Sequence, residues 1–195
     1  MRKLDEILNE AFSREQRKDL IELFSLLYAD DVAYAVAGGV AVAYWVIGRT
    51  ATKGDIDIVI EEGHFEDIVK FLYDRDWSVT SGGGVITGGL IERFFISGKR
   101  GGIKVDVLIV KDGLFFDNWR EWVKWEGVNV AVLRPMWLVQ FKYDSGRDKD
   151  NEDLIQLLRV MNDEEIKKTE YMALEFFGKD AWKEIELLIK EKELQ

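Results

Sequence analysis

The chain has 195 residues, of which 47% are hydrophobic and 33% are charged. This length and composition are typical of a soluble globular protein with a substantial core, and they exclude a disordered or low-complexity chain. Because the chain has no cysteine and one histidine, His64, disulfides, thiolate zinc sites and thiol catalysis are excluded, and a Ser-His-Asp triad is disfavoured.

Acidic residues outnumber basic residues by 37 to 27, which gives a net charge of −10. Such a charge disfavours non-specific binding to duplex nucleic acid, but it is compatible with a small anionic ligand held through a metal ion. The longest apolar stretch, Val32 to Ile47, contains a glycine pair and is short for a membrane span. The N-terminal residues lack the apolar region of a signal peptide, so we expect a cytoplasmic protein without membrane contact.

The first elements predicted are two helices. Apolar residues from Leu4 to Phe12 keep helical spacing, and Ser13 to Gln16 form a capping-box pattern. A second apolar helix face follows between Leu20 and Tyr28. The chain therefore opens with a helical pair.

A mixed pattern of strands and helices comes next. Val32 to Ala37 is typical of a short buried strand, and Val40 to Ile47 of a buried helix, with two glycines between them. Asp55 to Ile60 predicts a strand near the centre of a sheet. A helix with its apolar face between Phe65 and Leu72 follows.

The middle of the chain predicts further strands. We expect a strand at Trp77 to Thr80 and a glycine-rich loop at Ser81 to Gly89. Ile91 to Ile96 and Ile103 to Val110 predict a hairpin, with Ser97 to Gly102 as its tip.

Three tryptophans, Trp119, Trp122 and Trp125, then fall three residues apart. On a helix they would form a drifting stripe, which favours core packing or a dimer contact over base stacking. A strand is predicted from Val128 to Leu133.

From Pro135, which suits the first turn of a helix, the pattern is helical to the end of the chain. We therefore divide the chain into residues 1–133, the N-terminal helices with a mixed core, and 134–195, a helical extension packed on it. The fold class predicted is α/β (α+β): a mixed β-sheet flanked by helices.

The most informative motif is Asp55-Ile56-Asp57. Residues two apart on a strand point to the same face, with Cα atoms about 6.5 Å apart. Two carboxylates placed in this way can share a divalent ion such as Mg²⁺, while the isoleucines turn to the core. The alternative is that both acids are merely solvated at the start of a strand.

Two further features complete a candidate site. Gly38 and Gly39 stand where a strand gives way to a helix, and such a turn lets backbone N–H groups approach an anion closely. Asp106 alternates with Val105 and Val107 and supplies a third acid if its strand lies beside Asp55 to Ile60. Three convergent acids with two metal ions predict displacement at phosphorus.

These motifs resemble the nucleotidyltransferase superfamily typified by DNA polymerase beta, in which a Gly-Gly turn precedes Asp-x-Asp and a later single Asp. The sequence is most similar to the small prokaryotic branch of minimal nucleotidyltransferases and AbiEii-type toxins. Arg49 to Asp57 matches that branch, with extra residues between Arg49 and Asp55. Lys142 and the segment Lys149 to Asp153 are similar to its downstream motifs.

The resemblance implies a nucleotidyltransferase fold and the transfer of an NMP from an NTP to a hydroxyl acceptor, with release of pyrophosphate. It implies Mg²⁺ or Mn²⁺ as two ions held by Asp55, Asp57 and Asp106, with Asp106 also helping to deprotonate the acceptor. The implied nucleotide-binding residues are Gly38, Gly39, Arg49, Thr52 and Lys142. Arg49 or Lys142 would clamp the phosphates, although Lys142 could equally be a lysine whose stem lies along an apolar surface.

Several alternatives remain open. The acceptor could be an RNA 3′ end, a protein side chain or a small hydroxylated molecule, and a homodimer is one option for assembly. A second hypothesis is a Mg-NTP-binding module without turnover, such as part of a toxin–antitoxin or defence pair. A third is a metal-dependent phosphohydrolase on another scaffold, which would need more acids or histidines.

Overall fold

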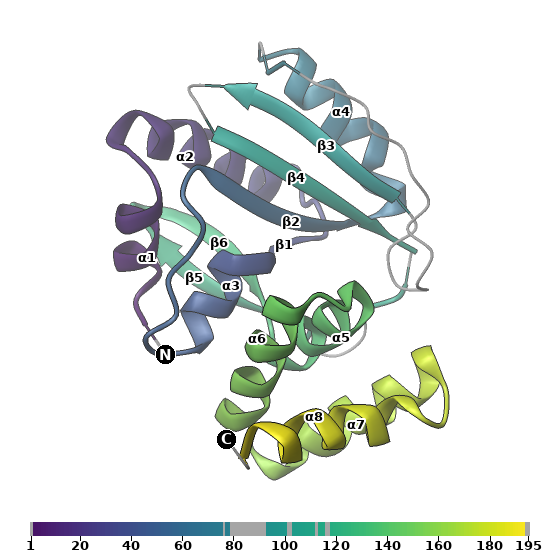
Figure 1. The fold of residues 1–195 in the computed structure, drawn as a ribbon. Coiled ribbons are helices and arrows are strands. Elements are labelled where there is room, and N and C mark those ends of the chain that lie inside the picture. Colours follow the sequence, from purple (N-terminus) through teal and green to yellow (C-terminus); the bar gives the residue numbers. More distant parts are fainter. Residues whose placement is uncertain are drawn as a thin grey trace. The chain divides into compact units, whose positions relative to one another are not determined.

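In the computed structural model, residues 2–75, 77–78, 93–100, 103–111, 113–115 and 118–193 are described, the stretches 93–100 and 191–193 by their backbone alone. The described chain divides into two compact units between Arg134 and Pro135. The first unit contains a sheet with helices, and the second is helical (Figure 1).

A mixed six-stranded sheet, in the order β3-β4-β2-β1-β6-β5, forms the first unit (Figure 1). Neighbouring strands are parallel in the pairs β2–β4 and β1–β6 and antiparallel in the other three pairs. The strands are β1 (Tyr34–Val36), β2 (Asp55–Glu61), β3 (Arg93–Arg100), β4 (Ile103–Val110), β5 (Arg120–Trp125) and β6 (Val128–Leu133). The predicted fold class, a mixed sheet flanked by helices, is confirmed.

The alternation of side chains explains why β2 is central. Ile56, Ile58 and Ile60 are fully buried, whereas Asp55 and Asp57 on the other face are only partly covered. β4 repeats the pattern with buried apolar residues at every second position. Burial of β-branched residues on one face therefore leaves the opposite face of these two strands for polar side chains.

Helices cover the sheet of the first unit. α2 packs against β6 and α4 against β3, and both lie behind the sheet in Figure 1. The helical elements are α1 (Leu4–Ala11), α2 (Arg14–Ala29), α3 (Gly38–Trp45), the short 3₁₀ helix η1 (Glu62–His64) and α4 (Phe65–Tyr73). The predicted N-terminal helical pair and its capping box are confirmed, since Ser13 and Gln16 exchange hydrogen bonds at the start of α2.

Two predicted boundaries are wrong. α3 begins at Gly38 rather than Val40, so the glycine pair forms the first turn of the helix instead of a separate loop. β3 continues to Arg100, so most of the expected hairpin tip at Ser97 to Gly102 is strand. A register shift between Ser97 and Lys99 lets the pairing with β4 continue past the glycine. The glycine-rich loop at Ser81 to Gly89 lies outside the described residues.

The tryptophan segment is a strand and not a helix. Trp122 and Trp125 belong to β5, which forms a hairpin with β6 through a two-residue turn. Trp125 is buried and meets Phe24 edge to face, which fits the expected core packing. Glu126 and Gly127 both have positive φ angles, as in a tight hairpin turn, so the chain reverses direction there. The spacing of the tryptophans alone gave no indication of this turn.

The second unit consists of α5 (Pro135–Ser145), α6 (Asp148–Val160), α7 (Asp163–Phe177) and α8 (Ala181–Glu193). Pro135 stands in the first turn of α5, and Asn162 forms a capping box with Glu165 at the start of α7. The apolar faces of α5 and α6 form much of its core, with Trp137, Leu154 and Leu157 fully buried. Among the described residues, none of the helices has both the length and the apolar character to cross a membrane.

Candidate active site

The pairing of β2 with β4 brings the predicted acids into register. β2 and β4 are parallel neighbours, and their register sets Asp57 opposite Asp106 and Asp55 opposite Lys104. The adjacency that the third acid required is therefore present. Because side chains two apart on a strand share a face, the three acids and Lys104 stand on one face of the sheet.

Lys104 lies among these acids. Its Nζ donates a hydrogen bond of 2.5 Å to Asp106 Oδ2 and is 3.7 Å from Asp55 Oδ1. Burial alone would lower the pKa of the Lys104 ammonium, but the hydrogen bond and charge of Asp106, with the charges of Asp55 and Asp57, raise it. The lysine is thus the cation that the acids of this face share in the structure.

Asp106 is the most buried of the acids, at 5% exposed. Burial raises the pKa of its carboxyl group, and the nearby charge of Asp55 acts in the same direction, while Lys104 opposes them. A carboxylate in this position needs a cation beside it, because burying an uncompensated charge is costly.

The glycine pair lies directly against the acids. Gly38 has a φ of +53°, and a Cβ at this position would stand 1.7 Å from Asp57 Oδ2. Only glycine fits, for the backbone angle and for the space. The amide of Ala37 donates a 2.8 Å hydrogen bond to the Asp57 carbonyl oxygen, which ties the turn between β1 and α3 to β2.

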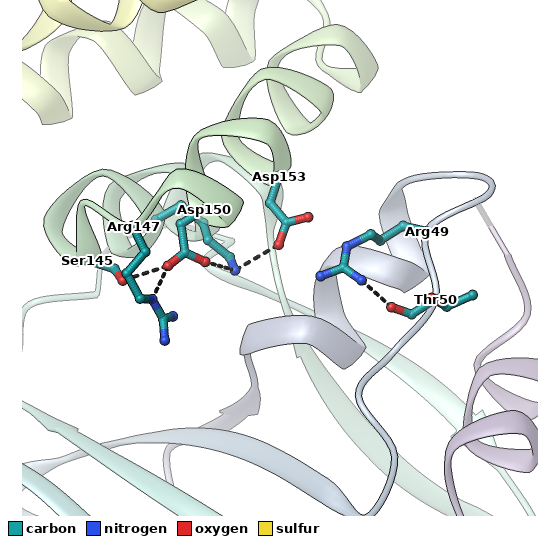
Figure 2. Close-up of polar contacts among 7 residues, drawn as sticks. Arg49, Thr50, Ser145, Arg147, Asp150 and Asp153 are labelled. Carbon is teal, nitrogen blue, oxygen red and sulfur yellow. Dashed lines mark hydrogen bonds and ion pairs between the residues drawn. The ribbon is translucent and has the colours of Figure 1, made fainter.

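The loop between α3 and β2 carries the other predicted nucleotide-binding residues of this unit. Thr52 lies beside Gly39, because a Cβ on Gly39 would be 3.5 Å from Thr52 Oγ1. The guanidinium of Arg49 donates to the Thr50 carbonyl oxygen (Figure 2), and the Arg49 carbonyl oxygen accepts a 3.2 Å bond from Arg2. The structure thus brings Thr52 to the glycine turn, and the contacts of Arg49 include Thr50 in its own loop and Arg2 near the N-terminus.

Lys142 belongs to the second unit, where it forms a buried ionic network. Its Nζ donates to Asp150 Oδ1 at 2.5 Å and to Asp153 Oδ2 at 2.9 Å. Ser145 Oγ and Arg147 Nε both donate to the other oxygen of Asp150, so this carboxylate lies between α5 and its own helix α6 (Figure 2). Asp150 and Asp153 are almost completely buried, at 0% and 3% exposed.

The network explains the electrostatics of Asp150. Burial alone would raise the pKa of its carboxyl group, but hydrogen bonds from Lys142, Ser145 and Arg147 and the charge of Lys142 hold that pKa below its usual value. From the sequence, Asp150 and Asp153 were assigned only to the segment Lys149 to Asp153, which is similar to a downstream motif of the nucleotidyltransferase branch. Sequence reasoning did not identify these two acids as the buried partners of Lys142. A signal was available, because Gln140 and Lys142 are polar residues within an otherwise apolar run and would need polar partners if buried.

Sequence reasoning also missed Lys104. The signal was available, because Lys104 and Asp106 are two apart on a strand and therefore share a face. The alternation of side chains along β4 predicted the face of Asp106 and of the valines, and it equally predicts that Lys104 shares the face of Asp106.

The donor chemistry of this face fits a divalent cation. Asp55 Oδ1 and Asp106 Oδ1 are buried, and neither forms a hydrogen bond with any part of the chain that the structure describes. Carboxylate oxygens are the ligands that Mg²⁺ and Mn²⁺ take. As they are placed, no three acidic or imidazole side chains of the described residues are close enough to hold a metal ion. Asp106 Oδ2 is occupied by Lys104.

Comparisons with known proteins locate this fold. No family model matches the sequence, and no curated protein matches it significantly. Among solved structures, a candidate nucleotidyltransferase from Thermotoga maritima is 20% identical, with a TM-score of 0.55, over 77% of this chain and 96% of that one.

Two antibiotic-modifying enzymes are also similar. The lincosamide antibiotic adenylyltransferase LnuA, in a lincomycin-bound structure, is 15% identical, with a TM-score of 0.51, over 74% of this chain and 97% of that one. ANT(2″)-Ia, in complex with adenylyl-2″-tobramycin, is 10% identical, with a TM-score of 0.52, over 80% of this chain and 96% of that one. The chain therefore has the nucleotidyltransferase fold, as its motifs predicted. The AbiEii-type branch stays a prediction.

Proposed function

We propose that this protein is a metal-dependent nucleotidyltransferase that transfers an NMP from an NTP to a hydroxyl acceptor. The observation that carries the proposal is the register of Asp57 against Asp106, on a face where the lack of a side chain at Gly38 leaves room for the Asp57 carboxylate. The nucleotidyltransferase fold of the similar structures supports it.

In this proposal Asp55, Asp57 and Asp106 hold two Mg²⁺ or Mn²⁺ ions, which, when bound, neutralise the charge that develops on the transferred phosphoryl group. The acceptor oxygen forms a bond to the α-phosphorus, the bond from that phosphorus to the bridging oxygen breaks, and pyrophosphate leaves. Asp106 receives the hydroxyl proton. The N-terminal turn of α3, at Gly38 and Gly39, offers backbone N–H groups to the β- and γ-phosphates.

Arg49 and Thr52 are proposed to hold the triphosphate from the loop that precedes β2. Of the two cations that the motifs offered as a clamp, Arg49 is the one we retain. Lys142 already gives two of its three N–H donors to Asp150 and Asp153 inside the second unit, so its role there is to hold α5 and α6 together.

For the acceptor we favour a small hydroxylated molecule over an RNA end or a protein side chain. The structure of ANT(2″)-Ia contains an adenylylated tobramycin, and LnuA is an adenylyltransferase of lincosamides. The net charge of −10 disfavours RNA and suits a cationic or neutral acceptor such as an amino sugar.

Label transfer tests the proposal directly. The protein would be incubated with each α-³²P-labelled NTP, Mg²⁺ or Mn²⁺, and an aminoglycoside, a lincosamide, total RNA, or a fractionated cell extract. Transfer by the native protein that stops in Asp57→Asn supports the proposal and identifies the acceptor class.

Absence of transfer with a Mg-NTP-dependent rise in melting temperature would favour the second candidate, a binding module without turnover. Absence of both would contradict the site itself.

A further inference from the structure

Lys104 places a positive charge among the acids of the candidate active site. Lys104 is contributed by β4, two residues before Asp106, and lies opposite Asp55 in the strand register. Its Nζ is 2.5 Å from Asp106 Oδ2 and 3.7 Å from Asp55 Oδ1. The ammonium group therefore bridges both strands that carry the acids.

This lysine compensates a charge that could not otherwise stay buried. The Asp106 side chain is 7% exposed, and Asp57 faces it across the strand pair. Two neighbouring carboxylates repel each other, and a buried one is destabilised further unless a cation is near. In the absence of a metal ion, Lys104 supplies that cation.

The Lys104 side chain also has room to move away from the acids into solvent. Its side chain is 34% exposed, in contrast to the 7% of Asp106, so its flexible four-carbon stem has a route to solvent. An arginine would form a rigid fork with a carboxylate, whereas an ammonium is a compact point charge that is readily rehydrated.

The oxygens around Lys104 are incompletely satisfied. Asp55 Oδ1 and Asp106 Oδ1 are buried and accept no hydrogen bond from the described residues. One ammonium thus offsets only part of the negative charge of the three acids and leaves these two oxygens without a hydrogen bond. A divalent cation offers more coordination positions and twice the charge.

We propose that Lys104 is the exchangeable counterion of this site: it holds Asp106 when no metal is bound and is displaced into solvent when a divalent cation binds. The inference rests on the proposed metal-dependent function. It makes Lys104 a positioning residue that keeps the acids assembled before substrate arrives and sets the metal concentration at which they load.

The first test measures metal binding without nucleotide. Free Mn²⁺ is titrated by electron paramagnetic resonance against the native protein, Lys104→Met, Lys104→Arg and Asp106→Asn. Lys124→Met is the matched control, because Lys124 is an exposed lysine on β5 of the same sheet. We expect Lys104→Met to bind Mn²⁺ about three- to tenfold more tightly than the native protein, since no cation has to be displaced.

Lys104→Arg should bind Mn²⁺ no more tightly than the native protein, and Lys124→Met should bind it equally. Circular dichroism in EDTA checks that each variant is folded. Without metal, we expect Lys104→Met to melt at a lower temperature than Lys124→Met and to gain more from added Mn²⁺. Unchanged or weaker Mn²⁺ binding by folded Lys104→Met would overturn the proposal.

A second test follows the displacement itself. Acetic anhydride labelling, read by mass spectrometry, reports the reactivity of each lysine in the native protein with EDTA and with Mg²⁺. The acetylation of Lys104 should rise on addition of Mg²⁺, and that of Lys124 should not. No rise at Lys104 under conditions where Mg²⁺ binds would refute the exchange.

The outcomes separate this inference from the proposed function. Mn²⁺ binding that is lost in Asp106→Asn but unaffected by Lys104→Met would leave the metal site standing and remove the role of Lys104. If neither the native protein nor Lys104→Met binds Mn²⁺, both the exchange and the metal-dependent function fail.

Discussion

Asp57 of β2 and Asp106 of β4 stand in register across a parallel strand pair, although they come from separate segments of the chain. Each is fixed by a different contact: the turn at Gly38 lies against Asp57, and Lys104 holds Asp106. A substitution at Gly38 therefore acts first on Asp57, and a substitution at Lys104 acts first on Asp106.

Replacing Asp106 by Asn keeps the shape of the side chain and removes its negative charge, and with it the proton-accepting role that we propose for Asp106. We expect the rate of NMP transfer to fall by at least about 100-fold. The measurement is transfer of ³²P from labelled NTP. Because the buried carboxylate is replaced by a neutral amide, Asp106→Asn should unfold in urea at a midpoint close to that of the native protein. An active Asp106→Asn variant would contradict the assignment of this residue.

Gly38→Ala tests the close approach of α3 to Asp57. The new Cβ would be placed 1.7 Å from Asp57 Oδ2 at a φ of +53°, so the carboxylate or the turn has to move. We expect transfer activity to be lost and stability to fall by more than the roughly 1–3 kcal/mol of backbone strain alone.

The matched control for this variant is Gly48→Ala. Gly48 has a φ of +89°, but a Cβ there meets nothing within 4 Å. Gly48→Ala should lower the stability by the cost of backbone strain and leave the transfer activity unchanged. Equal effects of the two substitutions on urea unfolding and on transfer would show that the contact with Asp57 is unimportant.

Lys142→Met removes the cation of the buried network and leaves Asp150 and Asp153 without its charge. Breaking a buried ion pair from one side costs about 3 kcal/mol or more, so we expect a clear loss in the free energy of unfolding. The measurement is urea denaturation. Lys168→Met on α7 is the control, because Lys168 is exposed and its pair with Glu164 lies on the surface. If both variants unfold alike, the network does not stabilise the second unit.

The lowered pKa of Asp150 predicts an acid-sensitive contribution to stability. A carboxyl group whose pKa is lower in the folded than in the unfolded chain stabilises the fold at pH values above its unfolded pKa of about 3.9. That stabilisation is lost as the pH falls through the lowered, folded pKa.

Asp150→Asn should therefore flatten the acid limb of a plot of unfolding free energy against pH, at a lower overall stability. Asp148→Asn serves as the control, since Asp148 is exposed in the same first turn of α6. The same acid limb in native protein and Asp150→Asn would contradict the lowered pKa.

The sequence predicted what periodicity and local chemistry determine. The alternation in Asp55 to Ile60 indicated both the strand and the face of its acids, and Ser13 with Gln16 indicated the start of α2. The glycine pair was predicted as a turn that lets backbone approach an anion, and the close approach of Gly38 to the Asp57 side chain is a contact that the sequence did not indicate.

Other features depend on contacts that no local pattern encodes. The strand order that places β4 beside β2 arises from packing across the whole sheet. β5 was missed because three tryptophans at intervals of three are compatible with a helix. In the structure the segment is a strand, which the turn at Glu126 and Gly127 joins to β6 in a hairpin. Lys142 on α5 has its partners Asp150 and Asp153 on α6, so no local pattern identifies them. Lys104 and Asp106, by contrast, are two residues apart on one strand, and this spacing already indicated that they share a face.

The parallel pairing of β2 with β4 has a consequence for how the protein folds. Parallel strands cannot be joined by a tight turn, so the chain leaves β2, forms α4 and β3, and returns before β4 can pair. Closing such a long connection carries an entropic cost that is recovered only when the strands meet. During synthesis, Asp55 and Asp57 are therefore added to the chain well before β4, the strand with which they pair. The face that carries Asp55, Asp57 and Asp106 is therefore assembled only when β4 pairs with β2.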